Sequence, residues 1–377
     1  MTIPPWHIRC RRGGGYIINA NMRQNARGMI YLIQSIVVSS RTRHYPNLIN
    51  CRVVMAGLDR VLVAIATLDR PVLLRRALLS LDNLRNSAGV VMHVLVVENR
   101  SPLTVETMIQ GLQREVSFPL SLHAAPERGI SNARNLAVDY ALRGGFDWLC
   151  FIDDDEEVDP DWLACLHRSA VQGGLDLAGG ACLPVNEIEP LTRGQRFLLD
   201  LMTREWRREA ALLERALAGA PIAPVYLRTA NWMCRVSALR RHHLRFLPEL
   251  NHCGGEDCAF SEMAFGCGLK QGFAPEALVY ETVPASRLNL GYLFRRHRDA
   301  AIGDEMRHRL LKGRKNPLRL MAEALLTGGK GIAHLLGAPL LGRAALLRAL
   351  IRFAICAGKF AWLTGRQPTH YLKTHGF

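Results

Sequence analysis

The stretch WLCFIDDDEEVDPDW, residues 148–162, is a short apolar run that ends abruptly in five consecutive acids. An uninterrupted apolar run of this length predicts a buried β-strand. Like charges crowded at the end of a strand repel one another. Water, a helix N-terminus or a metal ion must therefore offset the repulsion among Asp153, Asp154, Asp155, Glu156 and Glu157.

Strand and helix patterns alternate along the chain on both sides of this stretch. Strands and helices that alternate at this spacing predict βαβ units, and hence a parallel sheet with helices on both faces. The predicted strands are residues 61–66, 93–99, 119–125, 148–153 and 176–183, and the predicted helices are residues 71–84, 104–115, 129–145 and 160–174.

The positive charge of the chain lies in its flanks. The chain has 377 residues and a formal net charge of +15; residues 1–54 carry +8, residues 286–377 carry +13, and −6 remains for the middle. A basic chain suggests nucleic-acid binding, but a mildly acidic middle without a familiar binding motif argues against it. A chain of this length holds one large domain or two modest ones.

The ten cysteines form no Cys-x-x-Cys pair, and several lie in apolar runs. This usage predicts reduced, mostly buried thiols in a cytosolic setting. A zinc site is the alternative for His252, Cys253, Cys258 and Cys267, but their spacing fits no common zinc pattern.

Polar residues follow three of the predicted strands. Thr67 and Arg70 follow the first, Glu98 ends the second, and the acid run ends the fourth. Ligands of such sheets bind beyond the carboxyl ends of the strands. We therefore expect these side chains to meet at one edge of the sheet.

The spacing Asp153-x-Asp155 points both carboxylates the same way if the backbone is extended. Mg²⁺ and Mn²⁺ take oxygen ligands, often one or two carboxylates completed by water and substrate phosphates. A nucleotide diphosphate held through such an ion would offset the acidic repulsion. The alternative is a solvated acidic loop in which Asp159 caps the next helix.

Two further groups have chemical potential. Gly254 and Gly255 precede Glu256 and Asp257, and glycines permit a turn that aims a carboxylate into a cleft as a general base. N-capping by Asp257 is the alternative. Arg295, Arg296 and Arg298 lie close together on a predicted helix and suit a diphosphate, although a solvated basic face has the same pattern.

The motifs VAIATLDRP, VVEN, GISNARN, FIDDDEE, TANWMCR and GGEDCAF occur in this order over residues 61–303. The series resembles the family 2 glycosyltransferases of the GT-A fold, and most of all the bacterial enzymes typified by succinoglycan glucosyltransferases. The resemblance implies a Rossmann-like, mostly parallel sheet flanked by helices. It also implies inverting transfer of a sugar from a nucleotide donor with Mn²⁺ or Mg²⁺ as cofactor.

The resemblance also implies roles for individual residues. Asp257 matches the catalytic base, with Glu256 its neighbour, and Asp153 and Asp155 match the metal ligands, with Asp154 between them. Glu98 stands where the family usually has an Asp that reads the base, which leaves the nucleotide uncertain. The residues that match the donor site are Thr67, Arg70, Glu98, Arg134, Asn135, Asp154, Asn231, Trp232, Arg295 and Arg298. The processive members' Gln-x-x-Arg-Trp motif is absent, so we expect one sugar to be added per encounter.

Three domains are expected: a poorly packed basic extension over residues 1–54, a glycosyltransferase domain over residues 55–305 and a helical region over residues 306–377. In the helical region Arg348, Arg352 and Lys359 fall within roughly 40° of one another on a helix. An apolar helix with a basic stripe suits an anionic membrane surface. A helical pair packed on the catalytic domain, its stripe merely solvated, is the alternative, and Arg and Lys within the run make a spanning hairpin costly.

The leading hypothesis is an inverting hexosyltransferase that acts in cell-surface polysaccharide assembly. Its partners are a nucleotide sugar such as UDP-glucose, a saccharide acceptor linked to a lipid, and an anionic membrane surface. It would lie peripherally on the cytoplasmic face of the inner membrane or in the cytoplasm. The alternatives are a sugar nucleotidyltransferase, which lacks here the expected glycine-rich loop after the first strand, and a basic nucleic-acid-binding protein.

Overall fold

The computed structural model describes residues 58–85, 89–218, 225–366 and 368, together with four short strands within residues 7–32. The chain divides into two compact units, Met1–Val54 and Met55–Phe377. The first unit contains β1 (His7–Arg9) paired with β2 (Ile17–Asn19), and β3 (Met22–Gln24) paired with β4 (Ile30–Leu32), both antiparallel. The expected packing of residues 1–54 otherwise lies outside the described residues.

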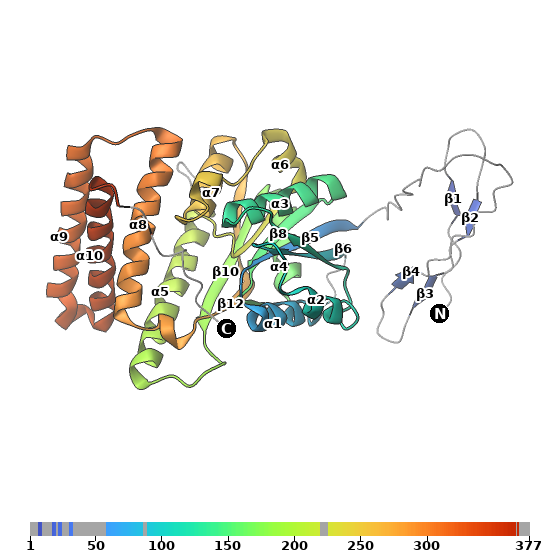
Figure 1. Cartoon of the computed structure of the whole chain (residues 1–377), viewed down its shortest axis with the longest axis horizontal. Coiled ribbons are helices and arrows are strands. Elements are labelled where there is room, and N and C mark those ends of the chain that lie inside the picture. Colours follow the sequence, from blue (N-terminus) through green and yellow to red (C-terminus); the bar gives the residue numbers. More distant parts are fainter. Residues whose placement is uncertain are drawn as a thin grey trace. The chain divides into compact units, whose positions relative to one another are not determined.

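The second unit is built on an eight-stranded sheet of order β7-β6-β5-β8-β11-β10-β12-β9 (Figure 1). Its strands are β5 (Asp59–Thr67), β6 (Val90–Glu98), β7 (Leu120–Ala124), β8 (Trp148–Asp153), β9 (Glu156–Val158), β10 (Leu177–Val185), β11 (Asn231–Arg235) and β12 (Gln271–Thr282). The strands β7, β6, β5 and β8 run parallel, as the alternating pattern predicts.

The other half of the sheet is mixed. β11 is antiparallel to both β8 and β10, and β9 is antiparallel to β12, whereas β10 and β12 are parallel. The expected mostly parallel sheet is confirmed, because only β9 and β11 run antiparallel to their neighbours. The connection from β10 to β11 contains one long helix, α5 (Arg193–Leu217), and β11 runs antiparallel to β10.

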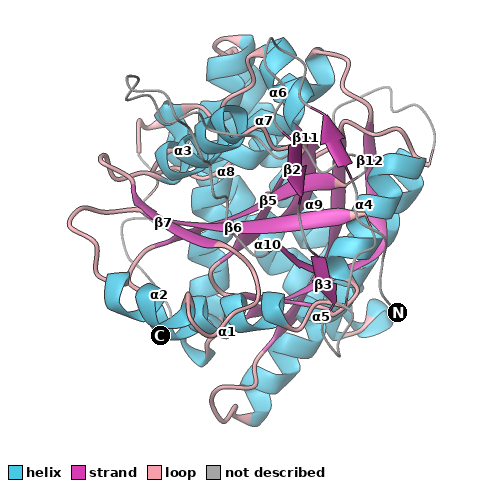
Figure 2. Cartoon of the chain, turned by 90° about the vertical axis from the view of Figure 1, so that its right-hand side faces the viewer, coloured by secondary structure: helices cyan, strands magenta, loops and turns pink. Residues whose placement is uncertain are grey.

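Helices cover both faces of the sheet (Figure 2). One face carries α1 (Pro71–Asp82), α2 (Glu106–Leu112) and α4 (Trp162–Gln172), and the other carries α3 (Ile130–Gly144), α6 (Val236–His242) and α7 (Glu256–Gly266). Alternate residues of β5 supply the two cores, with Val63 on one side and Leu62 on the other. The expected α/β fold with a C-terminal helical region is confirmed.

The C-terminal region consists of α8 (Leu290–Lys312), α9 (Pro317–Leu341) and α10 (Arg343–Leu363), with α10 between the other two (Figure 1). Short 3₁₀ turns at Pro248–Leu250 and Ala285–Arg287 lie before α7 and α8. Gly358 permits a close crossing, because a Cβ there would meet the carbonyl oxygen of Arg298 at 2.3 Å. The lack of a side chain at Gly358 therefore lets α10 pack closely against α8.

Candidate functional site

The carboxyl ends of three neighbouring strands bring the motifs together. Thr67 of β5 is paired with Glu98 of β6, and Ala66 is paired with Asp153 of β8. A cavity of about 290 Å³ opens there. Of the site residues predicted from the sequence, its wall includes Thr67, Arg70, Arg134, Asp153, Asp154, Asp155, Glu256 and Asp257.

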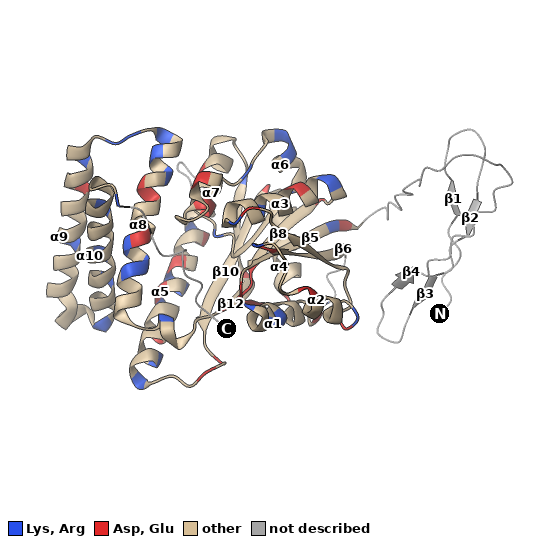
Figure 3. Cartoon of the chain, viewed as in Figure 1, with Lys and Arg blue, Asp and Glu red and all other residues tan. Residues whose placement is uncertain are grey.

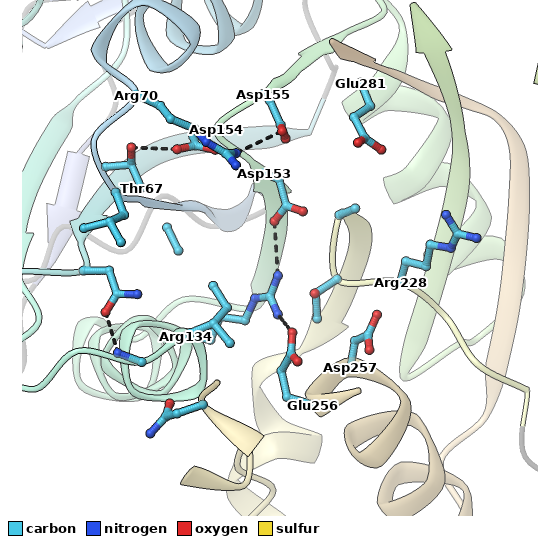
Figure 4. A pocket seen from close by; sticks show the side chains of 18 of the residues that line it. Thr67, Arg70, Arg134, Asp153, Asp154, Asp155, Arg228, Glu256, Asp257 and Glu281 are labelled. Atoms are coloured by element: carbon cyan, nitrogen blue, oxygen red, sulfur yellow. Dashed lines mark hydrogen bonds and ion pairs between the residues drawn. The ribbon is translucent and has the colours of Figure 1, made fainter. Parts of the chain in front are cut away.

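Arginine side chains hold the acid run at this cavity (Figure 4). Arg70 Nη1 lies 2.9 Å from both Asp154 Oδ1 and Asp155 Oδ2, and Thr67 Oγ1 donates to Asp154 Oδ2 at 2.8 Å. Burial, only partly offset by Arg70, raises the pKa of Asp154 to about 6. Cations from the chain itself thus offset much of the acidic repulsion.

Arg134 connects the acid run with the Glu256–Asp257 pair. Its guanidinium is 5% exposed; Nη1 donates to Glu256 Oε1, and Nη2 donates to Asp153 Oδ1 at 3.1 Å. Burial outweighs the attraction of Arg134 and raises the pKa of Glu256 to about 7. The buried Glu256 Oε2 finds no hydrogen-bond partner within the described part of the chain.

Asp257 lies on the cavity wall in the first turn of α7. Gly254 and Gly255 adopt φ values of 73° and 84°, a conformation that glycine takes without strain and that sharply turns the chain into the helix. The side chain is partly exposed, and the backbone N–H of Cys258 donates to its Oδ1. Asp257 thus presents a carboxylate to the cavity.

A second group of charged residues on the wall was not found from the sequence. Glu281 near the end of β12 lies 3.6 Å from Arg287, and Arg287 Nη1 also lies 3.3 Å from Asp155 Oδ2. Burial raises the pKa of Glu281. Glu281 could have been found from its place at the carboxyl end of β12, which runs parallel to β10, but the sequence pattern does not predict β12.

Arg228 lies on the wall of this cavity and of a smaller one of about 30 Å³. Its Nη2 donates to Glu209 Oε2 at 2.7 Å, and its guanidinium stacks 4.7 Å from the ring of Trp206. Both partners lie on α5. The smaller cavity therefore adjoins the larger one at Arg228, which Figure 4 shows on the same side as Asp257.

Four residues expected in the donor site contact other residues of the protein and do not line the larger cavity: Glu98, Asn135, Asn231 and Trp232. Glu98 is fully buried and accepts hydrogen bonds from the backbone and side chain of Thr104. Asn135 pairs with both backbone groups of Phe246 at 2.8 Å. These two side chains brace loops beside the cavity and do not line it.

Asn231 and Trp232 are 2% and 1% exposed. Asn231 accepts a hydrogen bond from Trp162 Nε1 and donates to two backbone carbonyl groups. Trp232 stacks on Phe260 at a centroid distance of 5.4 Å. Neither residue lies on the wall of the larger cavity, although Asn231 borders the smaller one.

The arginine cluster of α8 contributes Arg296 to the cavity, and not Arg295 or Arg298. Arg295 is exposed, and Arg298 pairs with Asp299 at 2.7 Å. His297 is partly buried; burial and the nearby Arg296 lower its pKa to about 4, so its ring is neutral at pH 7.

Among the residues that the structure describes, no three His, Cys, Asp or Glu side chains are grouped as a ready metal cage. The four residues considered for zinc are not such a group: Cys253 Sγ lies 3.3 Å from Met306 Sδ, and Cys267 is exposed. Asp153 is different, because its side chain is 38% exposed and only Oδ1 faces Arg134 (Figure 4).

The family model for glycosyl transferase family 2 matches residues 62–240. The succinoglycan biosynthesis protein ExoM of Rhizobium meliloti (strain 1021) is 28% identical over 270 residues, which cover 71% of this chain and 80% of that protein. The mannosyltransferase PcManGT of Pyrobaculum calidifontis, solved with GDP-Man and Mn²⁺, superposes with a TM-score of 0.55 at 18% identity over 83% of this chain and 89% of that chain. The S. aureus TarS 1–349 complex with UDP-GlcNAc has a TM-score of 0.44 at 14% identity, over 81% and 92% of the two chains.

The fold and the acidic cavity at its strand ends are those of a glycosyltransferase, and residues 62–240 are similar to family 2 of these enzymes. This similarity favours the leading hypothesis over a nucleotidyltransferase or a nucleic-acid-binding protein.

Proposed function

We propose that the protein is an inverting hexosyltransferase that uses a nucleoside-diphosphate sugar and a saccharide acceptor. One observation supports this most directly: Asp257 and the run Asp153–Asp155 lie on one cavity, and Arg134 binds both Asp153 and Glu256, the neighbour of Asp257. A base and a diphosphate-binding group at one cavity are what such a transfer requires.

We assign the position of the nucleotide sugar from the side chains on the wall of the larger cavity. Thr67, Arg70 and Asn99 form the end of the cavity nearest the strands, which suits the nucleoside. Arg287 and Arg296 lie beyond the acid run, where paired N–H groups suit the diphosphate. Arg296 thus takes the role that the sequence suggested for Arg295 and Arg298.

The donor set fits Mg²⁺ or Mn²⁺ without a preformed cage, because these ions need only one or two carboxylates beside water and phosphate oxygens. Asp153 and Asp155 would hold the ion, and Asp153 has an exposed oxygen for it. When bound, the ion would neutralise charge on the leaving diphosphate.

The remaining steps use side chains of the chain. Asp257 accepts the proton of the acceptor hydroxyl as that hydroxyl attacks the anomeric carbon. The nucleoside diphosphate leaves from the opposite face, where Arg287 and Arg296 hold its charge. Attack opposite the leaving group inverts the configuration, so that an α-linked donor gives a β-linked product. Arg134 positions Glu256 and Asp153 on the two sides of the reaction centre.

We propose that the acceptor binds on the α5 side, where Trp206, Glu209 and Arg228 line the smaller cavity next to the larger one. An aromatic ring with charged neighbours suits a sugar, whose faces are apolar and whose edges are polar. The likeness to ExoM supports an acceptor of exopolysaccharide assembly. We propose that this acceptor is carried on a lipid at the cytoplasmic face of the inner membrane.

The proposal is tested with a panel of nucleotide sugars, each incubated with Mn²⁺ or Mg²⁺. UDP-glucose, UDP-galactose, UDP-N-acetylglucosamine and GDP-mannose are the first donors. Release of nucleoside diphosphate is measured with and without soluble oligosaccharides. We expect slow hydrolysis of one donor that EDTA abolishes; no release from any donor would refute the proposal.

A further inference from the structure

The outer face of α9 is apolar and open. Leu318, Leu325, Ile332, Leu336 and Leu340 are 70%, 61%, 53%, 75% and 92% exposed. At 3.6 residues per turn these side chains fall within about 80° of one another. Isolated exposed leucines are ordinary on a soluble surface, but a continuous face of this kind marks an interaction site.

The inner face of α9 is occupied. Leu320, Ala324 and Gly331 are buried, and a Cβ at Gly331 would meet the ring of Phe353 on α10 at 2.8 Å. Glu323 accepts hydrogen bonds from Lys359 at 3.0 Å and from Lys315 at 3.2 Å. Both lysines also bind the buried Glu305 of α8. These contacts fix α9 on the surface of the protein.

The basic stripe expected on α10, formed by Arg348, Arg352 and Lys359, mostly contacts other parts of the protein. Arg348 pairs with Glu205 of α5 at 2.5 Å, and the side chain of Lys359 is only 16% exposed. Two of the three stripe residues therefore stabilise the protein internally, and Arg352 alone of the three is exposed. The lipid-facing stripe expected on α10 is thus not present as a surface.

Basic residues lie along one side of the apolar face of α9 instead. Arg319, 74% exposed in its side chain, and the exposed Lys330 lie about 100–120° around the helix from the centre of the leucine face. The C-terminal segment 286–377 carries +13 in total. Figure 3 shows α9 as a largely uncharged helix with charges at its side. Basic side chains beside an apolar face complement the headgroups and acyl boundary of an anionic bilayer.

We propose that α9 lies flat on an anionic phospholipid surface, with Leu318, Leu325, Ile332, Leu336 and Leu340 in the acyl boundary and Arg319 and Lys330 at the headgroups. Within the described residues, α9 is the one helix long and apolar enough to cross a membrane, with a mean hydropathy of 1.2. Spanning would bring Glu323, Lys359 and Glu305 into hydrocarbon or break their pairs, which is costly. The flat arrangement keeps every one of these pairs.

This surface deepens the proposed function, since it brings the active site to a lipid-linked acceptor. The first two turns of α8 contribute Tyr292 and Arg296 to the cavity wall, and the body of α8 packs on α10, which in turn packs on α9. The cavity and the lipid-binding face are therefore parts of one packed unit. The test below measures lipid binding without any sugar transfer, so the two proposals can fail separately.

The experiment is co-sedimentation of the full chain with sucrose-loaded vesicles of phosphatidylglycerol and phosphatidylcholine, or of phosphatidylcholine alone. We expect Leu325→Ser/Leu336→Ser to reduce partitioning at least about tenfold on the mixed vesicles. Arg319→Gln/Lys330→Gln should reduce it about tenfold on the mixed vesicles and leave phosphatidylcholine binding unchanged. Val171→Ser/Leu212→Ser is the matched control, because these residues are 48% and 54% exposed on α4 and α5.

The comparison includes only variants whose helicity and unfolding temperature equal those of the wild type. Unchanged vesicle binding in the α9 leucine variant would overturn the proposal. So would retention of the wild type on vesicles after alkaline carbonate extraction, which indicates a spanning helix. A dimer detected by ultracentrifugation, abolished by the leucine pair in a chain that binds no vesicles, would show that a second copy covers this face.

Discussion

Arg134 Nη2 lies 3.1 Å from Asp153 Oδ1, and Nη1 of the same guanidinium donates to Glu256. One arginine therefore binds both Glu256 and the residue expected to hold the metal. Three elements, α3, β8 and α7, meet at this one guanidinium. The arrangement makes Arg134 the residue on which the geometry of both halves of the site depends.

Replacing Arg134 by Met should destabilise the fold by about 3–5 kcal/mol, because it leaves a buried carboxylate without its cation. The double variant Arg134→Met/Glu256→Met should recover much of this loss, since both charges are then removed. Denaturant unfolding of the wild type, the two single variants and the double variant measures the coupling. Equal stability of the single and double variants would show that Glu256 does not depend on Arg134.

The metal assignment is tested by Asp153→Asn, a change at a half-exposed carboxylate that should leave the fold intact. We expect Mn²⁺ binding in the presence of UDP to weaken at least about tenfold, because hard cations prefer charged oxygen ligands. Electron paramagnetic resonance of free Mn²⁺ measures the affinity directly. The matched control is Glu157→Gln in the same acid run, whose side chain pairs with Arg76 and does not line the cavity. Equal affinities in both variants would contradict the assignment.

The ion network of the C-terminal helices should give an acid-sensitive stability. Burial alone raises the pKa of Glu323, but hydrogen bonds from Lys359 and Lys315 outweigh it and lower the pKa to about 2. A carboxyl group whose folded pKa is below its unfolded value contributes stability that is complete above about pH 4.5 and is lost as the pH falls toward 2. The difference in unfolding temperature between wild type and Glu323→Gln should therefore shrink as the pH falls from 5 to 3.

Glu214→Gln is the control for this titration, because Glu214 is exposed on α5 and no ion pair of it occurs among the described residues. The raised pKa values of Asp154 and Glu256 act in the opposite direction, toward greater stability at lower pH, and they are common to all three proteins. A constant difference between wild type and Glu323→Gln from pH 5 to pH 3 would contradict the network's contribution.

The parallel half of the sheet could be derived from the sequence, because strand ends in βαβ units meet at one edge by geometry. This placed Thr67 near Asp153 without any further information. The mixed half could not be derived: β12 contains Gly272 and Pro275 and lacks a clear period, so Glu281 was missed. Trp232 was assigned by its place in a motif, whereas packing against Phe260 requires it in the core.

The helical region shows a second limit of sequence patterns. The sequence correctly predicts that Arg348 and Lys359 lie on one side of α10. Helical periodicity alone does not show which side of a helix faces the rest of the protein. Their acidic partners, Glu205 and Glu305, lie on separate helices far away in the sequence. Ion pairs with these carboxylates therefore hold the basic side of α10 inward.

The acceptor wall is tested by Trp206→Ala. We expect the KM for the best soluble oligosaccharide acceptor to rise about tenfold, equivalent to about 1.4 kcal/mol, because an apolar platform for the sugar is lost. Hydrolysis of the donor by water should not change, since Trp206 lies outside the larger cavity. Trp206→Phe should largely restore the KM. A fall in donor hydrolysis equal to the loss of transfer would indicate a structural role instead.

Asp257→Asn should separate catalysis from donor binding. Removing the proton acceptor should lower the rate of transfer about 10²–10⁴-fold, the usual range for a general base. Donor affinity, measured by isothermal titration with the nucleotide sugar and Mn²⁺, should stay within about threefold, because the diphosphate is assigned to Arg287, Arg296 and the Asp153–Asp155 run. Asn has nearly the shape of Asp and can still accept from the backbone N–H of Cys258, so the first turn of α7 should persist. If donor affinity falls as far as the rate, Asp257 binds the donor and the base must be sought elsewhere on the cavity wall.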